Sequence, residues 1–257
     1  MGKILILPDV HGREFWRKPC LEHKDEFEKI IFLGDYLAPY EYEEISNEHA
    51  IDVFKEILEF KKKNMKKVVL LFGNHDGSYI NTEICECRTD HANWSRLNTL
   101  FMENMNLFDL AWETEIGDKR YFFSHAGVRK GWLKNVAGKL FTWDDMDKLP
   151  DAEMFNNAFH LAYQDQDTIT EVREDFEYCI GMYSFYRGWG GWDNGSIVWA
   201  DIMEYGDDKS IEYPDVMFIC GHTQLEDKPI ITDWVADLDV RRPFVLDTDT
   251  GKIEEYE

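Results

Sequence analysis

Short apolar runs, each followed by a polar or glycine-containing turn, recur along the chain. They cover residues 3–7, 29–33, 67–72, 120–123 and 216–220. Nearly continuous stretches of Ile, Leu, Val and Phe of this length are typical of strands that are buried on both faces. The pattern therefore predicts five core strands.

A helical pattern lies between the second and third runs. Ser46 or Asn47 can cap this helix at its N-terminus. Apolar residues then recur on one face at helical spacing, namely Ala50, Ile51, Phe54, Ile57 and Leu58. A strand, a helix and a strand in this order indicate a layered α/β fold.

The remaining segments have less regular patterns. Residues 81–112 are predicted to be helical from the spacing of their aromatic, Leu and Met residues. Residues 131–190 are rich in aromatic and acidic residues and show no clear strand, so we interpret them as a helical insertion, or cap. Residues 244–246 and 252–255 are predicted to form a closing hairpin. Without repeats or low-complexity linkers, residues 1–257 are expected to form a single domain.

The charge of the chain limits the classes of function. It has 28 Lys and Arg against 51 Asp and Glu, which gives a formal net charge of −23. This excess argues against a protein that grips long nucleic acid through its phosphates, and against docking on anionic membranes. No apolar run approaches the roughly 18–20 residues of a membrane helix. Five scattered cysteines suit free thiols in a reducing compartment, so we expect a cytoplasmic protein.

Polar side chains follow all five predicted strands. The segments are Asp9-Val10-His11-Gly12, Gly34-Asp35-Tyr36, Gly73-Asn74-His75-Asp76, Ser124-His125-Ala126-Gly127 and Gly221-His222-Thr223. Sites in open α/β sheets form where the carboxyl ends of strands converge. Carboxylate, imidazole and amide oxygen together suit borderline divalent metals such as Mn, Fe or Zn.

The number of candidate ligands favours two metal ions. The six candidates are Asp9, His11, Asp35, Asn74, His125 and His222. One ion with an open position needs about three protein ligands. A shared carboxylate can bridge two neighbouring ions, and Asp35 is the expected bridge because it alone follows the second strand.

The order of these motifs resembles the calcineurin-like metallophosphoesterase superfamily. Within it, the chain looks closest to the phosphoprotein phosphatases and their bacterial relatives, including diadenosine tetraphosphatases. The resemblance implies an α/β four-layer sandwich, in which two packed mixed β-sheets are flanked by helices. It also implies that His75 protonates the leaving oxygen. The implied ligands are Asp9, His11 and Asp35 for one metal, and Asp35, Asn74, His125 and His222 for the other.

The loop after the second strand departs from that pattern. Phosphoprotein phosphatases read Gly-Asp-x-x-Asp-Arg-Gly, whereas this chain has Ala38 and Pro39 at the positions of the second Asp and the Arg. In the family, that Asp pairs with the catalytic histidine and that Arg holds the phosphate. Either Ala38 is an engineered replacement of Asp, or Asp76 acts as a catalytic substitute beside His75. The candidate phosphate-binding arginines are Arg187, which opens the Gly- and Trp-rich loop 188–195, and Arg13, Arg129 and Arg88.

The leading functional interpretation is a two-metal-dependent phosphoesterase, similar to serine/threonine phosphatases. It would hydrolyse a phosphomonoester, in a phosphoprotein or a small metabolite, by attack of a metal-bridging hydroxide. One alternative is a hydrolase of nucleotide polyphosphates of the dinucleoside tetraphosphate type, which an aromatic-rich insertion would suit. A nuclease or cyclic-nucleotide phosphodiesterase fits the charge and the Gly-His-Thr motif less well. From another class, Ala38 and Pro39 favour a metal-binding scaffold with weakened catalysis.

Overall fold

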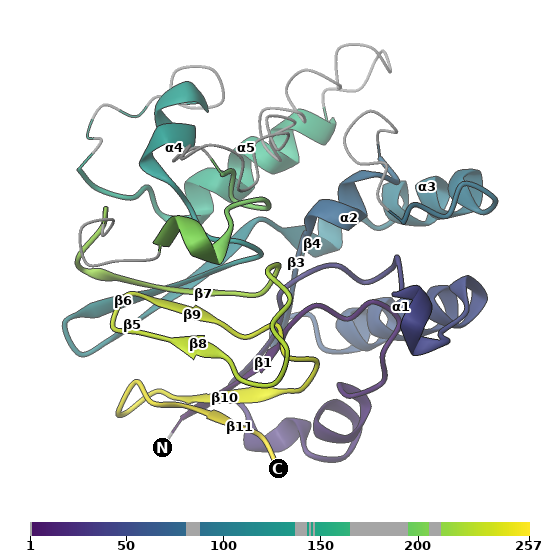
Figure 1. Ribbon diagram of the computed structural model, residues 1–257, viewed down its shortest axis with the longest axis horizontal. Coiled ribbons are helices and arrows are strands. Elements are labelled where there is room, and N and C mark those ends of the chain that lie inside the picture. Colours follow the sequence, from purple (N-terminus) through teal and green to yellow (C-terminus); the bar gives the residue numbers. More distant parts are fainter. Residues whose placement is uncertain are drawn as a thin grey trace.

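Two mixed β-sheets form the centre of the protein in the computed structural model (Figure 1). The structure describes residues 2–80, 88–136, 143, 145, 147–164, 195–205 and 212–257. Both chain ends lie at the same end of the molecule, near the β10–β11 hairpin (Figure 1). Among the described residues, no helix is both long enough and apolar enough to span a bilayer.

The first sheet has the strand order β11-β10-β1-β2-β3-β4. Its strands are β1 (Lys3–Leu7), β2 (Lys29–Phe32), β3 (Val68–Leu71), β4 (Phe108–Asp109), β10 (Phe244–Asp247) and β11 (Ile253–Glu255). Strands β1 to β4 run parallel, whereas β10 pairs antiparallel with both β1 and β11. The predicted closing hairpin is therefore confirmed.

The second sheet has the strand order β5-β6-β7-β9-β8. Its strands are β5 (Ala111–Ile116), β6 (Lys119–Ser124), β7 (Val216–Cys220), β8 (Ile230–Ile231) and β9 (Val235–Asp237). Strands β6, β7 and β9 run parallel, and β5 and β8 are antiparallel edge strands. All five predicted core strands are present in the two sheets.

Helices cover the outer face of each sheet. The α-helices are α1 (Asn47–Lys63), α2 (Asn74–Gly77), α3 (Trp94–Met102), α4 (Lys130–Val136) and α5 (Ala152–Gln164). Shorter helical turns lie at Lys18–Glu22, Lys24–Glu26, Glu41–Glu43, Met105–Leu107 and Ile202–Tyr205. Helix α1 begins as predicted, because the Ser46 hydroxyl accepts a hydrogen bond from the His49 amide at 3.2 Å.

Alternation along the strands divides the core into layers. Ile4 and Ile6 of β1 pack between the two sheets with Phe123 of β6, whereas Leu5 and Leu7 face outward toward α1. On the far side, Phe122 of β6 meets Phe155 of α5 with ring centroids 5.8 Å apart. The molecule is thus a four-layer α/β sandwich, as the family resemblance implied.

The two segments predicted to be helical differ in outcome. The prediction of a helix over 81–112 is wrong at its C-terminal end, because residues 108–109 and 111–116 pair as β4 and β5, and residues 81–87 lie outside the described part. Strand β4 pairs with the distant β3, which a local helical pattern does not reveal. Strand β5 instead forms a hairpin with the adjacent β6 through a turn at residues 117–118, and the helical prediction overlooked this local signal. Helices α4 and α5 occupy part of 131–190, but residues 165–194 lie outside the described part, so the insertion stays a prediction.

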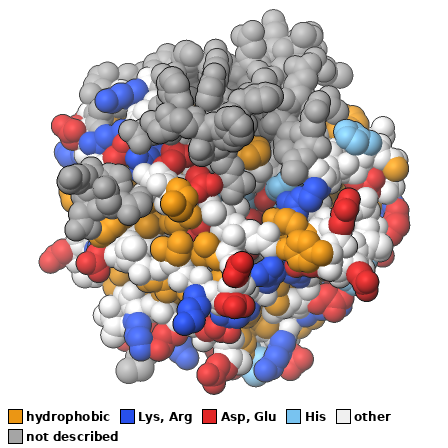
Figure 2. Space-filling model, in the orientation of Figure 1, with side chains coloured by type: hydrophobic (Ala, Val, Ile, Leu, Met, Phe, Trp, Pro, Cys, Tyr) orange, Lys and Arg blue, Asp and Glu red, His pale blue; other side chains and the backbone are white. Residues whose placement is uncertain are grey.

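Acidic side chains on the described surface lie among basic ones, and several form ion pairs (Figure 2). On the face shown in Figure 2, acidic and basic side chains are interspersed among the described residues. Many acids pair locally, such as Glu56 with Arg17 at 2.8 Å and Glu48 with Arg96 at 3.0 Å. Exposed pairs of this kind contribute little to stability.

Candidate metal centre

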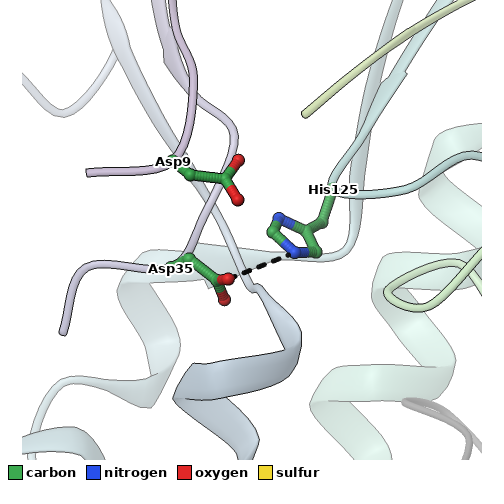
Figure 3. Close-up of side chains that lie close together, drawn as sticks. All are labelled: Asp9, Asp35 and His125. Atoms are coloured by element: carbon green, nitrogen blue, oxygen red, sulfur yellow. Dashed lines mark ion pairs between the residues drawn. The ribbon is translucent and has the colours of Figure 1, made fainter. Parts of the chain in front are cut away.

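The loops that follow β1, β2, β3, β6 and β7 meet at one end of the sandwich. Figure 3 shows that Asp9 and Asp35, from the first sheet, face His125, which follows β6 of the second sheet. The ligand atoms of these three side chains lie within 4.8 Å of one another. All three residues are almost fully buried. Two sheets packed face to face thus bring together side chains that are far apart in the sequence.

Asp35 lies at the middle of the group. Its Oδ2 is 3.6 Å from His11 Nε2 and 3.6 Å from His125 Nε2. The Asp9 Oδ2 atom lies 3.9 Å from the same His11 nitrogen. One oxygen of Asp35 therefore faces two separate imidazoles, as a shared carboxylate between two cations would.

A second set of donors adjoins the first at His125. Asn74 Oδ1 lies 2.9 Å from His125 Nε2 and 3.0 Å from His222 Nδ1. The two imidazole nitrogens are 3.2 Å apart. All six predicted ligands therefore converge: Asp9 and His11 lie on one side of Asp35, and the other three lie on its His125 side.

Backbone carbonyls fix the tautomers of two histidines. His11 Nδ1 lies 2.7 Å from the Leu37 carbonyl oxygen, and His125 Nδ1 lies 2.8 Å from that of Leu33. A carbonyl oxygen only accepts, so each Nδ1 carries the hydrogen, and in the neutral imidazole each Nε2 is the atom left to ligate a metal. Lone pairs that converge on one point at 3.6 Å suit a cation between them.

The protonation of His11 leads to the same conclusion. Burial, followed by the positive groups of His75, Arg88 and Arg13, lowers the pKa of His11 well below its ordinary value. Its buried Nε2 has no hydrogen-bond partner among the described residues. A neutral imidazole with an orphaned lone pair is the form that ligates metals. The residues therefore fit a pair of divalent cations.

The backbone of the site is strained. His11, Asp35 and His222 have φ angles of 44°, 53° and 71°, in the left-handed region that side chains other than glycine seldom adopt. Such conformations cost of order 1–3 kcal/mol each and persist where the surrounding structure enforces them. Three of the candidate ligands thus share a left-handed backbone conformation, which His and Asp adopt more readily than most other residues.

Two glycines permit the close packing of the aspartates. A Cβ atom at Gly73 would overlap Asp35 Oδ1, and one at Gly221 would overlap Asp9 Oδ1. In each case an amide of the same loop binds the aspartate, with His75 N donating to Asp35 Oδ1 at 2.9 Å and His222 N donating to Asp9 Oδ1 at 3.0 Å. These bonds hold the carboxylates in place and leave Asp35 Oδ2 facing the imidazoles.

Asp76 ties two of the loops together. Its buried carboxylate accepts hydrogen bonds from the amides of Gly73 at 2.9 Å, Asp35 at 2.9 Å and Tyr36 at 3.1 Å. Burial, and then the charge of Asp35, raise the pKa of Asp76 well above its ordinary value. This arrangement gives Asp76 a positioning role and does not favour the expectation that it pairs with the side chain of His75.

His75 lies beside the donor set and contacts an arginine. Its ring centroid is 5.3 Å from that of His11, and the residue is 8 % exposed. Its Nε2 lies 2.8 Å from Arg88 Nη2, and a guanidinium only donates, so Nε2 is the acceptor of this bond. Position 38, where the phosphoprotein phosphatase motif that the sequence resembles has its second Asp, holds Ala38 with a φ of 60°.

The arginines predicted to bind phosphate are placed differently. Arg13 is buried, with its Nε 2.9 Å from Glu43 Oε2 and its Nη1 donating to the Asp9 carbonyl oxygen at 3.0 Å. Arg129 is buried, with its Nε 3.6 Å from Glu212 and 3.8 Å from Glu204. Both guanidinium groups are thus balanced by carboxylates, and Arg187 lies outside the described residues.

Two further buried acids were not predicted from the sequence. Asp237 and Asp239 are 0 % and 1 % exposed, and burial raises the pKa of each well above its ordinary value. The charge of Asp9 raises both further. They stand at the end of the short strand β9, whose residues show no strand pattern, so only the folded structure reveals their burial.

Comparison with known families identifies the family to which a chain with this donor set belongs. The family model for calcineurin-like phosphoesterases matches residues 2–226. The chain belongs to this family. Membership implies hydrolysis of phosphoesters with divalent metals, and the described donor set contains a candidate site for them at Asp9, Asp35 and His125.

Solved structures share the fold of this phosphoesterase. A cold-active protein-tyrosine phosphatase from the psychrophile Shewanella sp. is 12 % identical. The two structures align with a TM-score of 0.57 over 100 % of this chain and 81 % of that one. A point mutant of a cold-active protein tyrosine phosphatase gives 12 % identity and a TM-score of 0.59, with the same 100 % and 81 % coverage. At this identity the likeness concerns the fold alone. Comparison with curated proteins gives no match.

Proposed function

We propose that this phosphoesterase hydrolyses phosphomonoesters with two divalent cations, of Mn, Fe or Zn. The observation that carries the proposal is the position of Asp35 Oδ2, which lies 3.6 Å from imidazole nitrogens of both His11 and His125. A carboxylate shared between two adjacent donor sets is the arrangement that two-metal hydrolases require. The substrate would be a phosphoprotein or a small phosphorylated metabolite.

The two cations would be held by overlapping sets of side chains. Bound there, they would polarise the phosphoryl oxygens and acidify water. The first set is Asp9, His11 and Asp35, and the second is Asp35, Asn74, His125 and His222.

His75 is the proposed source of the proton for the leaving oxygen. It stands next to the donor set without belonging to it, and it is only slightly exposed. An imidazole titrates near neutral pH, and its protonated form, in which Nε2 no longer accepts from Arg88, can protonate an alkoxide that would otherwise leave slowly. The Asp35 carboxylate fixes the backbone of His75 by accepting a hydrogen bond of 2.9 Å from its amide.

Ala38 bears on the strength of this catalysis. Its φ of 60° is a conformation that Asp and Asn adopt more readily than most other residues. This backbone supports the hypothesis that an aspartate belongs at position 38 and that alanine there has weakened the enzyme. The alternative, a scaffold that binds metals without turnover, is one outcome of the experiments below.

A specific observation favours nucleotide polyphosphates as a second candidate substrate class. Tyr42 is 62 % exposed, yet its hydroxyl accepts hydrogen bonds from Gln224 and from Arg241, the latter at 3.3 Å. Its ring lies 5.3 Å from that of Tyr40, which in turn lies 5.1 Å from His11. An exposed aromatic ring held in place near the site could stack on a nucleobase.

Turnover with defined substrates tests the proposal. Purified protein loaded with Mn²⁺ should hydrolyse p-nitrophenyl phosphate, lose this activity with a chelator and regain it with metal. Turnover only of bis-p-nitrophenyl phosphate would instead show a phosphodiesterase, and preference for dinucleoside tetraphosphate would support the second candidate. Metal content without any turnover, including in Ala38→Asp, would contradict both and support the scaffold.

A further inference from the structure

We propose that Arg88, held on the ring of Tyr40, is the arginine that binds the phosphoryl group of the substrate. The inference rests on the proposed function and deepens it. The loop after β2 has Pro39 where related phosphatases have their phosphate-binding arginine. In this chain the guanidinium would come from a different loop.

Arg88 lies at the edge of the candidate metal centre. Its Nη2 is 2.8 Å from His75 Nε2, and the His75 ring is 5.3 Å from that of the candidate ligand His11. The guanidinium is therefore one side chain away from the donor set, on the side of the proposed proton donor. A phosphate ester that reached both the metals and His75 would lie next to it.

Tyr40 lies in the loop that has Pro39 in place of an arginine, and its ring supports the guanidinium of Arg88. The Arg88 Cζ atom lies 3.5 Å from the centroid of the Tyr40 ring, and this ring meets His11 edge-on at 5.1 Å. Stacking uses the face of a guanidinium and leaves its N–H groups, which lie in the plane, free to donate. Tyr40 thus fixes the plane of Arg88 without consuming its donors.

One donor of Arg88 calls for an acceptor. Its Nη1 is buried and has no hydrogen-bond partner among the described residues. Leaving a buried charged donor unsatisfied is costly, and an anionic oxygen would remove that cost. A planar guanidinium can donate two parallel bonds to a phosphoryl group, so Nη1 and Nη2 together suit this ligand.

The charge of Arg88 is also available. Arg13 and Arg129 lie within 4 Å of carboxylates, whereas no carboxylate of the described part of the chain pairs with Arg88. Its φ of 56° is a further strained backbone position beside the site. Of these three arginines, Arg88 alone combines contact with His75, a rigid support and, within the described residues, no carboxylate partner.

Binding of inorganic phosphate tests the role of Arg88 without requiring turnover. Isothermal titration calorimetry on the Mn²⁺-loaded protein should show that Arg88→Ala weakens phosphate binding by about 10- to 100-fold, because one or two charge-assisted hydrogen bonds are lost. Arg88→Lys should recover part of the affinity, since it keeps the charge without the planar fork. Tyr40→Leu should weaken binding while Arg88 is still present.

Matched controls separate this effect from a general one. Arg96→Ala removes an exposed arginine that pairs with Glu48, and it should bind phosphate within twofold of wild type. Metal content, measured on every variant, should stay at the wild-type level. With p-nitrophenyl phosphate, Arg88→Ala should raise KM as well as lower kcat, and Arg88→Lys should restore part of KM.

The outcomes distinguish this inference from the proposed function. If Arg88→Ala binds phosphate within twofold of wild type, or if the wild type binds none, the assignment of Arg88 is wrong. Phosphate binding that depends on Arg88 in a protein that hydrolyses no ester would keep the assignment and refute the phosphomonoesterase. Hydrolysis with unchanged phosphate affinity in Arg88→Ala would do the reverse.

Discussion

Substituting Asp35 by Asn separates the metal-binding role of this side chain from its role in the fold. Asn has nearly the same shape and can still accept the hydrogen bond from the His75 amide, which is 2.9 Å long. It lacks the negative charge that faces His11 and His125 at 3.6 Å each. We expect metal-free Asp35→Asn to be more stable than metal-free wild type, and to gain much less stability from Mn²⁺.

The magnitude follows from the spacing of the buried acids. Two unit charges at 4.8 Å, the outer limit for the ligand atoms of Asp9 and Asp35, repel by about 3.5 kcal/mol at an effective dielectric constant of about 20. Weakening the charge-assisted bond to His75 N would offset about 1 kcal/mol. The net gain of about 2 kcal/mol raises the Tm of the metal-free variant by about 4–8 °C for a chain of this size.

Thermal unfolding with and without metal measures both effects. Melting curves are recorded in a chelator and in excess Mn²⁺, where a metal at 100 times its Kd adds about 2.7 kcal/mol to the wild type. Asp25→Asn is the control, because this side chain is 86 % exposed and should change neither curve. If metal-free Asp35→Asn melts no higher than wild type, or if Mn²⁺ stabilises both proteins equally, the assignment of Asp35 as the shared ligand is refuted.

Three further changes test other parts of the site. Ala38→Asp should raise the phosphatase rate about tenfold or more, because one charge-assisted hydrogen bond to His75 is worth about 1.5–3 kcal/mol; an unchanged rate would refute the hypothesis that aspartate belongs there. Gly73→Ala would place a Cβ 2.5 Å from Asp35 N and displace the carboxylate. It should cost about 1–3 kcal/mol of stability and abolish Mn²⁺ binding in a titration, and normal binding would contradict this geometry. Burial raises the pKa of Asp237, so folded protein retains a proton that unfolded chain loses above about pH 4. The metal-free protein should therefore lose stability as the pH rises from about 4 toward the raised pKa. In urea unfolding, the free energy of unfolding of Asp237→Asn should fall less steeply with pH than that of the wild type. Equal pH dependence in both proteins would contradict this role of Asp237.

The linear pattern of residues was enough to predict the positions of the five core strands along the chain and the side chains that follow them. This was possible because buried parallel strands are continuous apolar runs, and because the candidate ligands lie within a few residues of each strand end. Helix α1 was predictable for the same reason, since its cap at Ser46 and its apolar face are local features. The six candidate ligands could therefore be named from the sequence.

How those side chains face one another, and which charges stay available, depends on the packing of the two sheets. Strand β4 pairs with β3 across helices α2 and α3, and β9 pairs with β7 across β8. The burial of Asp237 at the end of β9 follows from this second pairing. Arg13 was one candidate for phosphate binding because it follows His11 closely in the sequence, yet it pairs with Glu43, while Arg88 reaches His75 and stacks on Tyr40. Proximity in the chain fixes which residues enter the site, but charge pairing and stacking depend on contacts between loops, and these form only when the two sheets pack together.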